Sequence, residues 1–422
     1  MADKYTAPKG TTDLIGAQAR GWEFLTTTAR EVFSHYGYEP LYTPIFEHTE
    51  LFTRGIGEAT DVVGKEMYTF EDKGGRSLTL RPENTASVVR AAINANITAN
   101  GQAAKLYYAG PMFRYERPQK GRQRQFYQIG AEALGLNSPE ADAEMIIMLW
   151  HFFCQAGIPA DSMRLLVNSM GDGACRPAYR DKVAAFIKEH GDELCEECNA
   201  RANTNPLRAF DCKNPSCREV FASAPLLKDE LCDECAEHHA RVLSLLEAAG
   251  VPYVEDPTLV RGLDYYTRTV FEVQVDNGLG SQNAIGGGGR YDGLFESLGG
   301  KPTSGLGFAL GFERTLLALE ASGVTFEDGS SIDVYVAVAD DLYRDEAFKL
   351  ATELRRNDVG ALVDVAGKSL KAQFKQADHA SARYTVIFAP DEYAQGKVVV
   401  RNMATKEERL VAPSEVQEAI GA

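Results

Sequence analysis

A strongly basic stretch of the chain is flanked by two segments in which apolar and polar residues alternate, at positions 105–115 and 124–134. Alternation with a period of two is typical of β-strands, and two such strands joined by a polar loop pair as an antiparallel hairpin. The connecting loop, residues 116–125, is longer than the usual two-residue turn. The sequence therefore predicts a long hairpin with concentrated positive charge at its tip.

The charge of this loop contrasts with that of the whole chain. Four arginines and one lysine lie within residues 114–124, opposed only by Glu116, whereas the 422-residue chain has a formal net charge of −16. Such acidity argues against nonspecific coating of nucleic acid, which needs many basic contacts, but it allows one local basic site. The loop is therefore either a solvated segment that pairs with the acidic surface or the site of one anionic partner.

Two domains are expected from the length and from a change of pattern near residue 330. Residues 1–325 mix strand-like segments with helical ones, among them residues 21–37 and an apolar helix that ends at Gly157. Short strands and helices alternate in residues 331–422, which predicts a small α/β domain. The polar residues 321–331 predict a linker between the two.

An inserted helical unit is predicted at residues 171–249, which are helix-forming, charged and cysteine-bearing with little alternation. The chain has no run of eighteen apolar residues, and its first ten residues lack the apolar centre of a signal peptide. A cytoplasmic protein without membrane contact is therefore expected. In that compartment the eight cysteines are more often thiols or metal ligands than disulfides.

Two Cys-x-x-Cys pairs in this unit have the spacing of a structural Zn²⁺ site. They are Cys195 with Cys198 and Cys232 with Cys235, and Cys212 and Cys217 lie between them as competing ligands or as a further pair. The alternative is a set of reduced, partly buried thiols. The spacing does not favour a zinc site over reduced thiols, or reduced thiols over a zinc site.

Three arginines from distant parts of the chain are candidates for binding a polyphosphate: Arg114 in the hairpin, Arg261 in LVRGLDYYTRTVFE and Arg314 in GLGFALGFERTL. Guanidinium groups bind phosphate oxygens bidentately, and phosphoryl chemistry depends mainly on positioned positive charge. Phe126 could offer a flat face to a nucleobase. The P-loop and protein-kinase signatures are absent from the sequence, so a nucleotide enzyme of another class is predicted.

The glycine run at residues 286–289, followed by Arg290, is flanked by apolar residues. It is either a flexible turn or, as we expect from its surroundings, a strand that a ligand approaches closely. Its spacing differs from that of the dinucleotide fingerprint, which opens a helix after a parallel strand.

Five segments of the chain resemble the histidyl-tRNA synthetase family of class II aminoacyl-tRNA synthetases. GYEPLYTPIFE, PMFRYERPQKGRQRQFYQIGAE and GLGFALGFER resemble the three class motifs, and RGLDYYTRTVFE and GGGGRYDGL resemble segments peculiar to the histidine enzyme. The resemblance covers the whole chain. It implies an α+β catalytic domain on a mostly antiparallel sheet with a helical insertion, a C-terminal α/β domain that binds the anticodon, and a homodimer with the first motif's proline near its interface.

The resemblance implies a reaction in two steps, in which ATP and L-histidine form histidyl-adenylate with release of pyrophosphate, and the histidyl group then passes to the 3′-terminal ribose of tRNA(His). ATP would be accompanied by Mg²⁺. Arg114 and Arg261 would hold the α-phosphate and Arg314 the γ-phosphate. Glu116 would fix the adenine end and Phe126 would stack on the ring.

Six residues would form the histidine pocket by the same resemblance, together with Arg261. Glu132 and Tyr266 would read the imidazole; Glu83, Thr85 and Gln128 would bind the α-amino group; Tyr265 would line the pocket. A site that pairs both ring nitrogens can discriminate strongly, because an analogue that lacks one leaves a buried polar group unpaired. For the tyrosines, and first for Tyr265, the alternative is a buried aromatic residue with a satisfied hydroxyl.

RPENTA departs from the family pattern at Asn84, where glycine is usual. Asparagine tolerates the left-handed conformation better than most residues, so a positive φ is expected there.

Contacts with tRNA are expected at both ends of the chain. Gln119 and Arg124 would touch the acceptor end. Lys368, Lys371 and Lys375 lie at helical spacing in the last domain, either as a solvated face or as contacts to the tRNA backbone.

Two other functions compete with the ligase. A histidine-sensing regulatory subunit of ATP phosphoribosyltransferase shares the family core, but it usually lacks the anticodon-binding domain and has degraded catalytic motifs. A tRNA-binding structural protein would not need a histidine pocket. The C-terminal domain and the three arginines favour the enzyme.

Overall fold

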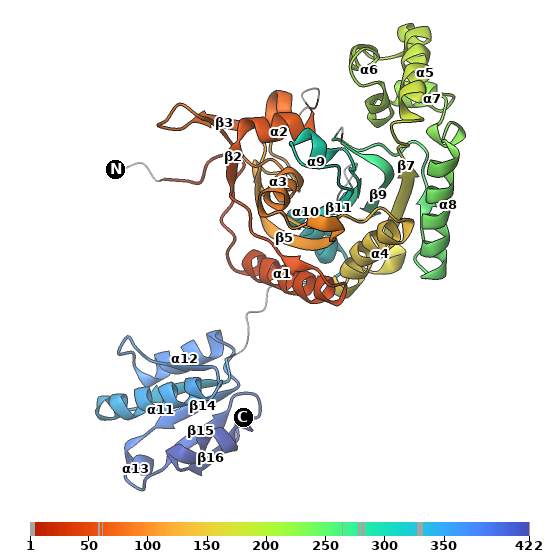
Figure 1. Cartoon of the computed structure of the whole chain (residues 1–422). Helices are drawn as coiled ribbons and strands as arrows, with labels where there is room; N and C mark the ends of the chain where they lie inside the picture. The colour runs from red at the N-terminus through yellow and green to blue at the C-terminus, as the bar shows by residue number, and fades with distance from the viewer. Residues whose placement is uncertain are drawn as a thin grey trace. The chain divides into compact units, whose positions relative to one another are not determined.

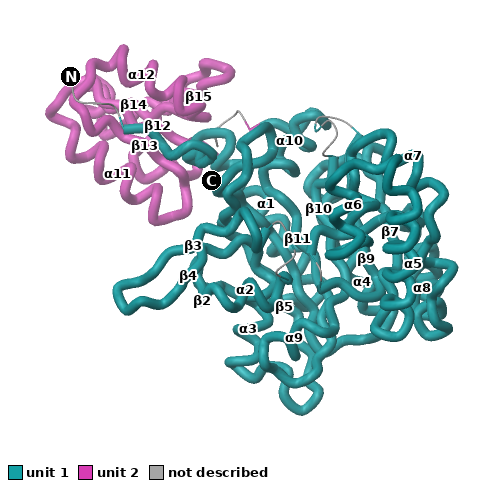
Figure 2. Tube along the Cα trace, turned by 90° about the horizontal axis from the view of Figure 1, so that it is seen from above, with its two compact units in different colours: residues 1–325 teal, residues 326–422 magenta. Residues whose placement is uncertain are grey.

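The structure is a computed structural model that describes residues 5–57, 60, 62–263, 265–276, 279, 283–326 and 332–421. The chain divides into two compact units, residues 1–325 and 326–422 (Figure 2). Part of the expected linker, residues 327–331, and Asp264 of the quoted segment RGLDYYTRTVFE lie outside the described residues.

An eight-stranded sheet forms the centre of the first unit (Figure 1), in the order β1-β5-β6-β11-β10-β9-β7-β8. In that order the strands span Glu39–Pro40, Ala104–Phe113, Gln125–Leu134, Gly305–Gly311, Ala284–Arg290, Thr267–Val275, Met163–Ser169 and Val254–Glu255. The short edge strands β1 and β8 pair in parallel with their neighbours, and the other pairs are antiparallel. The predicted mostly antiparallel α+β fold is confirmed.

The basic loop connects two long strands of this sheet. β5 and β6 pair from Ala104 opposite Leu134 to Phe113 opposite Gln125, which confirms the predicted hairpin. β6 also pairs with β11, and β11 passes directly into helix α10 (Phe312–Ala321), as the sequence predicts. The hairpin loop and the start of α10 are therefore brought to neighbouring positions by the pairing of β6 with β11.

Helices pack on the sheet and close its core. α1 (Ala17–His35) buries Leu25, Ala29, Val32 and Phe33, which follow the helical period of the sequence. The Phe33 ring lies 5.6 Å from that of Phe308 on β11, between centroids. The other helices of this part are α2 (Thr49–Ile56), α3 (Thr85–Ala95), α4 (Pro139–Ala156) and α9 (Leu294–Ser297).

A small three-stranded sheet projects from the first unit in both views (Figures 1 and 2). Its order is β2-β4-β3, and the strands span Phe46–His48, Ser77–Leu80 and Tyr68–Glu71. β4 is followed by a turn and α3. This places the first turn of α3 between the small sheet and the central one.

Helix α4 ends at Gly157, as predicted, and Gly157 has a φ of 106°. A Cβ at this position would also lie 3.2 Å from Cγ2 of Val324. We expect Gly157→Ala to lower the free energy of unfolding of the first unit by about 1–2 kcal/mol, the usual cost of left-handed backbone for a residue with a Cβ. Urea unfolding followed by circular dichroism measures this. Gly293→Ala is the control, because Gly293 has a φ of −86° and open space around it; equal midpoints for the two variants would contradict the prediction.

The predicted helical insertion leaves the sheet after β7 and returns to it through β8. It contains α5 (Arg176–Glu189), α6 (Glu196–Arg201), a 3-10 helix (Pro206–Asp211), α7 (Pro215–Phe221) and α8 (Asp233–Ala248). α8 packs against α4 and against strands β7 and β9 (Figure 1). The fully buried pair of Arg290 on β10 and Asp142 on α4 accompanies this contact, and His238 of α8 lies 2.8 Å from Asp142. The insertion is thus anchored to the eight-stranded sheet by a buried polar network.

The second unit is a small α/β fold, as predicted. Its sheet has the order β13-β12-β14-β15-β16, spanning Ala361–Val363, Val334–Val338, Tyr384–Phe388, Val398–Asn402 and Glu408–Val411. The first three strands are parallel and the last two antiparallel to their neighbours. The helices are α11 (Arg344–Arg356), α12 (Leu370–His379), α13 (Pro390–Tyr393) and α14 (Val416–Ala419). Within the described residues of the chain, no helix has the length and apolar character needed to cross a membrane.

Candidate functional site

A pocket of about 440 Å³ is lined by residues of β6, β10 and β11, of the loop between β5 and β6, and of α10. Ten residues singled out in the sequence line it: Glu83, Thr85, Arg114, Glu116, Phe126, Gln128, Arg261, Tyr265, Tyr266 and Arg314. Glu132 adjoins it through hydrogen bonds from Thr85 and Tyr291, which are lining residues. Among the described residues, the lining does not include Gln119 or Arg124.

Three arginines reach this pocket from different elements. Arg114 follows β5, and its Nε donates to the carbonyl of Pro82 at 2.8 Å. Arg314 in α10 donates from Nη1 to the carbonyl of Ala284 at 3.0 Å. Arg261 precedes β9 and forms an ion pair with Glu272. The structure therefore gathers guanidinium groups from residues 114, 261 and 314 around one cavity.

Arg261 and Arg314 are both partly buried, but their charges are balanced differently. Burial lowers the pKa of Arg261, and Glu272 together with Tyr266 and Asp211 more than offsets this, so the net direction is upward. Burial and the nearby Arg122 lower the pKa of Arg314. Nε of Arg261 is buried and has no hydrogen-bond partner within the described part of the chain. A buried donor without a partner is costly, so this group is available to an anionic ligand.

Phe126 and Glu116 lie near Arg114 on one side of the pocket. The guanidinium carbon of Arg114 is 5.2 Å from the centre of the Phe126 ring. Glu116 forms an ion pair with Arg122 at 2.9 Å. The Arg114 guanidinium group is thus already in a cation–π contact with the Phe126 ring. A planar base bound at this ring would lie beside that positive charge.

Gln119 and Arg124 of the loop lie outside the pocket lining, whereas Gly121, Arg122 and Gln123 belong to it. Gln119 and Arg122 pair across the hairpin tip. Arg124 lies over the ring of Tyr115, 4.0 Å from its centre, and its Nε donates to the carbonyl of Glu116 at 3.2 Å. The loop therefore has two sides, one with residues in the lining and one with Gln119 and Arg124.

Glu132 is fully buried at the end of the pocket. Its carboxylate accepts hydrogen bonds from Thr85 Oγ1 at 2.8 Å, from the Tyr291 hydroxyl at 2.5 Å and from the Tyr108 hydroxyl at 3.5 Å. Burial raises the pKa of Glu132 to about 8, against the effect of these donors. Gly307 makes room for it, because a Cβ there would lie 1.7 Å from Oε2 of Glu132.

Glu83 and Gln128 offer oxygen atoms of different kinds. The Glu83 carboxylate accepts hydrogen bonds from the backbone amides of Thr85 (2.7 Å) and Ala86 (3.0 Å) at the start of α3, and burial raises the pKa of its carboxyl group. Oε1 of Gln128 is buried and accepts no hydrogen bond from any described residue. An ammonium group could donate hydrogen bonds both to the Glu83 carboxylate and to Oε1 of Gln128.

The rings of Tyr265 and Tyr266 are in contact, with centres 4.7 Å apart and planes tilted by 55°, and Tyr265 also contacts Tyr291. Arg176 of the insertion donates a hydrogen bond to the Tyr266 carbonyl. Burial raises the pKa of both hydroxyls, which keeps them neutral donors. The two tyrosines thus connect the pocket to the inserted unit.

The expected positive φ of Asn84 is wrong. Asn84 has φ −114° and ψ −12° immediately before α3, and it is fully buried. Its Oδ1 accepts hydrogen bonds from Oγ1 of Thr43 (2.6 Å) and Nη1 of Arg81 (3.3 Å). The side chain is therefore held by polar contacts, and the backbone of Asn84 has an ordinary negative φ. The position does not require a residue that tolerates the left-handed conformation.

Several lining residues were not predicted. Tyr291, Tyr108, Arg208, Glu272 and Glu313 all line the pocket. Tyr291 follows Arg290 in GGGGRYDGL, Glu313 precedes Arg314 in GLGFALGFER, and Glu272 ends RGLDYYTRTVFE, so three quoted segments contained the signal. Tyr108 lies on β5 in ordinary alternating sequence, and Arg208 lies in the insertion. Nothing in the local pattern distinguishes these two.

The glycine run forms most of β10, and Gly286 and Gly287 line the pocket. A Cβ on Gly287 would lie 2.5 Å from the carbonyl oxygen of Phe271 and 3.0 Å from Nη1 of Arg261. The run is therefore a strand and not a flexible turn. In the protein itself it is the Arg261 side chain that approaches this backbone.

The two Cys-x-x-Cys pairs do not form one site. Cys195 and Cys198 lie with Cys212 and Cys217, whereas Cys232 and Cys235 lie with Asp172 and Cys175. The predicted set of Cys195, Cys198, Cys232 and Cys235 is wrong, because the pairs stand at the starts of different helices, α6 and α8. Neither group lines the pocket in the described structure.

Comparison with known proteins covers nearly the whole chain. Residues 10–315 match the family model described as histidyl-tRNA synthetase, and residues 333–422 match the one described as anticodon binding domain. The histidine–tRNA ligase of Halothermothrix orenii is 48% identical over 95% of each chain, and that of Desulforamulus reducens is 47% identical over 97% of each. The crystal structure of apo S. aureus histidyl-tRNA synthetase is 37% identical, covers 99% of this chain and 100% of that one, and has a TM-score of 0.84.

Proposed function

The chain belongs to the histidyl-tRNA synthetase family, and we propose that its pocket activates L-histidine with ATP and transfers the histidyl group to the 3′-terminal ribose of tRNA(His). The observation that carries this proposal is the gathering of Arg114, Arg261 and Arg314 around the same cavity that ends at the buried carboxylate of Glu132. The end of the cavity with the arginines suits a polyphosphate, and the end with Glu132 suits an imidazole.

In the first step, a carboxylate oxygen of histidine attacks the α-phosphorus of ATP, and the bond from that phosphorus to the pyrophosphate oxygen breaks. Negative charge grows on the α-phosphate and on the leaving oxygen. Arg114 and Arg261 would stabilise the charge at the α-phosphate, and Arg314 would hold the γ-phosphate. Fixed guanidinium groups in a buried site provide this stabilisation without reorganisation during the reaction.

Magnesium is expected with ATP, and one carboxylate of the pocket is suited to it. Glu313 lines the pocket beside Arg314 and accepts a hydrogen bond from the Tyr127 amide at 3.0 Å. Burial raises the pKa of Glu313 to about 7, an effect that a nearby cation would oppose. Mg²⁺ prefers carboxylate and phosphate oxygens and would neutralise charge on ATP, so Glu313 is the residue we propose to meet it.

Histidine recognition would use the oxygen-rich end of the pocket. Gln128 Oε1 lacks a partner among the described residues and would accept from the α-amino group, together with Glu83 and Thr85. Glu132 would accept a ring N–H, and Tyr266 would meet the other side of the ring, with Tyr265 beside it. Tyr291 would hold Glu132 in place through the hydrogen bond between them.

Phe126 is proposed to stack on the adenine ring, and this assignment predicts a selective effect. Phe126→Leu keeps an apolar side chain but removes the aromatic face, so we expect KM for ATP to rise about tenfold, since stacking of a base on an aromatic ring contributes about 1–3 kcal/mol. KM for histidine should stay unchanged. Pyrophosphate exchange measured over a range of ATP and histidine concentrations tests this, and an equal rise in both constants would show that the substitution disturbs the whole pocket.

Contacts with tRNA are proposed for both units. Gln119 and Arg124 lie on the side of the loop away from the pocket lining, where the acceptor end could reach them. In the second unit, which matches an anticodon binding domain, Lys371 and Lys375 are exposed on α12, and Lys368 is exposed but precedes the helix, so the three do not share one helical face as expected. Phosphate contacts from such lysines would be sensitive to salt.

A homodimer is proposed from exposed apolar side chains near the first class motif. Tyr42 is 86% exposed, Ile45 44%, Phe46 52% and Phe70 44%. The rings of Phe46 and Phe70 are in contact on adjacent parts of the small sheet. Contiguous exposed apolar residues are typical of interfaces. Sedimentation equilibrium should give the mass of two chains, and a cytosolic location, where tRNA and ATP meet, can be checked by fractionation.

The direct test of the proposed function is histidine-dependent exchange of pyrophosphate into ATP. Robust exchange and charging of tRNA(His) are expected. Histidine binding without exchange would instead support the histidine-sensing regulatory subunit. The match of residues 333–422 to an anticodon binding domain and the presence of Arg114, Arg261 and Arg314 already favour the ligase.

A further inference from the structure

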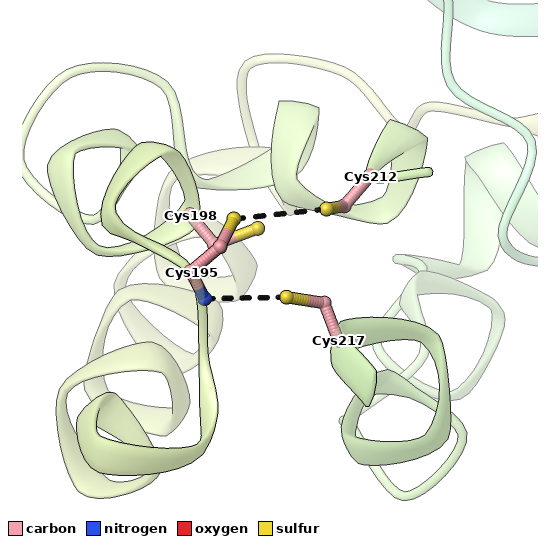
Figure 3. Close-up of side chains that lie close together, drawn as sticks. All are labelled: Cys195, Cys198, Cys212 and Cys217. Carbon is pink, nitrogen blue, oxygen red and sulfur yellow. Dashed lines mark hydrogen bonds between the residues drawn. The ribbon is translucent and has the colours of Figure 1, made fainter. Parts of the chain in front are cut away.

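Four cysteines from separate elements of the insertion converge on one point. The Sγ atoms of Cys195, Cys198, Cys212 and Cys217 all lie within 4.8 Å of one another (Figure 3). Cys195 and Cys198 belong to the start of α6, Cys212 follows the 3-10 helix, and Cys217 lies in α7. None of the four is in a disulfide. The group therefore joins three short elements of the insertion at one point.

The distances in this group are those of a tetrahedral metal site. Zinc binds thiolate sulfur at about 2.3 Å, which places two sulfur ligands of a tetrahedron about 3.8 Å apart. Sγ of Cys195 and Sγ of Cys212 are 3.9 Å apart, whereas the sulfurs of a disulfide are about 2.05 Å apart. The amide N–H of Cys195 donates to Sγ of Cys217 at 3.3 Å, a contact that stabilises a thiolate and orients it as a ligand (Figure 3).

Apolar packing alone does not account for this arrangement. Cys198 and Cys217 are fully buried in the core of the insertion, where a thiol can act as a small apolar group. Cys195, however, is partly exposed, and its sulfur still faces the others. The helices involved have only six and seven residues, too few to be stable by themselves. A metal cross-link would supply what these elements lack.

A second group lies where the insertion joins the catalytic sheet. It consists of Asp172 and Cys175, between β7 and α5, with Cys232 and Cys235 at the start of α8. Oδ1 of Asp172 is 3.7 Å from Sγ of Cys175 and 4.0 Å from Sγ of Cys232. Its other oxygen is held by Nη2 of Arg268 at 3.2 Å. One carboxylate oxygen and three sulfurs therefore face one another, and all are zinc ligands.

We propose that the inserted unit binds two structural zinc ions, one through Cys195, Cys198, Cys212 and Cys217 and the other through Asp172, Cys175, Cys232 and Cys235. The first site fixes the interior of the insertion. The second fixes its two ends to each other, because the segment that leaves the sheet and the helix that returns to it contribute two ligands each. Both sites are closed, since four protein ligands complete a tetrahedron.

The first site has a consequence for the pocket that rests on the proposed function. Cys212 directly follows the 3-10 helix Pro206–Asp211, which carries Arg208 into the pocket lining. Nη1 of Arg208 donates to the carbonyl of Gly262 at 3.1 Å, next to Arg261. Loss of the ion at this site should free the helix and thereby weaken the support of the loop that presents Arg261.

Metal content of the full-length protein tests the proposal. The protein is purified under reducing conditions without added metal, and zinc per chain is measured by inductively coupled plasma mass spectrometry. We expect two zinc ions per chain, one in Cys217→Ser, one in Cys235→Ser and two in the matched control Cys154→Ser, since Cys154 lies on α4 outside both groups. No stoichiometric zinc, or two ions retained in both Cys217→Ser and Cys235→Ser, would overturn the proposal. One ion lost only with Cys217 would overturn the second site.

Two measurements on the unmodified chain keep the test valid if the variants misfold. After exchange of zinc for cobalt, the absorption spectrum should show sulfur-to-cobalt charge transfer with tetrahedral d–d bands; a spectrum of oxygen ligands alone overturns both sites. Thiol titration of the denatured protein without reductant should find all eight cysteines, and fewer would indicate disulfides instead. A protein that exchanges pyrophosphate but contains no zinc overturns only this inference, whereas a zinc-loaded protein without exchange overturns only the proposed function.

Discussion

Arg261→Ala is expected to lower histidine-dependent pyrophosphate exchange by at least about 10³-fold, with the circular dichroism spectrum unchanged. Positioned arginines in phosphoryl transfer contribute about 10³–10⁵ in kcat. Arg261 is placed for this by its ion pair with Glu272 and by the backbone of Gly287, which leaves no room for a side chain beside it. The loss should appear in kcat more than in KM for ATP, because the charge that Arg261 stabilises develops in the transition state.

The substitution also leaves the Glu272 carboxylate without its cation. A double variant separates this effect from the loss of the guanidinium group, and a second variant serves as the control. Arg261→Ala combined with Glu272→Gln removes the repulsion between the carboxylate and the phosphates, and we expect it to restore less than a tenth of the lost activity. Arg164→Ala is the matched control, since Arg164 is exposed on β7 away from the pocket. Near-normal exchange in Arg261→Ala would remove Arg261 from the reaction.

Much of the fold follows from local patterns that the sequence displays directly. The segments with period-two alternation, residues 105–115 and 124–134, correspond to β5 and β6. Residues 21–37, which have apolar side chains at helical spacing, correspond to most of α1. These predictions succeed because side-chain alternation and helical spacing are properties of consecutive residues. The passage of β11 into α10 could be predicted for the same reason.

The polar details of the site depend on contacts between residues far apart in the sequence. Asn84 accepts a hydrogen bond from Thr43, which lies 41 residues before it, and the sequence around Asn84 gave no sign of this contact. Tyr108 and Glu132 lie on paired strands, Tyr108 opposite Gly130 and Glu132 opposite Leu106, so their hydrogen bond exists only once the register of β5 and β6 is set. Patterns of consecutive residues cannot contain such information.

The cysteines illustrate the same limit. Both Cys-x-x-Cys pairs were visible, but spacing alone could not tell which partners each would find. Asp172, which lies 60 residues before Cys232, has no ligand signature in its surroundings. The path of α5 to α8 decides the grouping, because it brings the start of α8 back to the end of β7.

Glu132→Gln should lower kcat/KM for histidine about 100-fold while KM for ATP stays unchanged. The amide keeps the shape of the carboxylate and one oxygen acceptor, but it loses the charge that strengthens a hydrogen bond from the imidazole, and hydrogen bonds to charged groups contribute about 1.5–3 kcal/mol. Exchange assays at saturating ATP measure this. Glu140→Gln is the control, because Glu140 pairs with Arg241 on the surface. A rise in KM for ATP of similar size would contradict a role of Glu132 in histidine recognition.

The same variant should change how stability depends on pH. The pKa of Glu132 is raised by burial to about 8, from an ordinary value of 4.5. A native state that holds a proton more tightly than the unfolded chain loses stability as pH rises between these values, because ionisation then favours unfolding. The amide does not ionise, so the free energy of unfolding of Glu132→Gln minus that of the unmodified protein should be more positive at pH 8.5 than at pH 5, which means that the variant is relatively more stable at the higher pH. Urea unfolding at the two pH values measures this difference, and a difference that does not change with pH would mean that Glu132 is already ionised in the empty pocket. The expected result gives the carboxylate a defined role: it destabilises the empty enzyme, and it is kept because histidine binds to it.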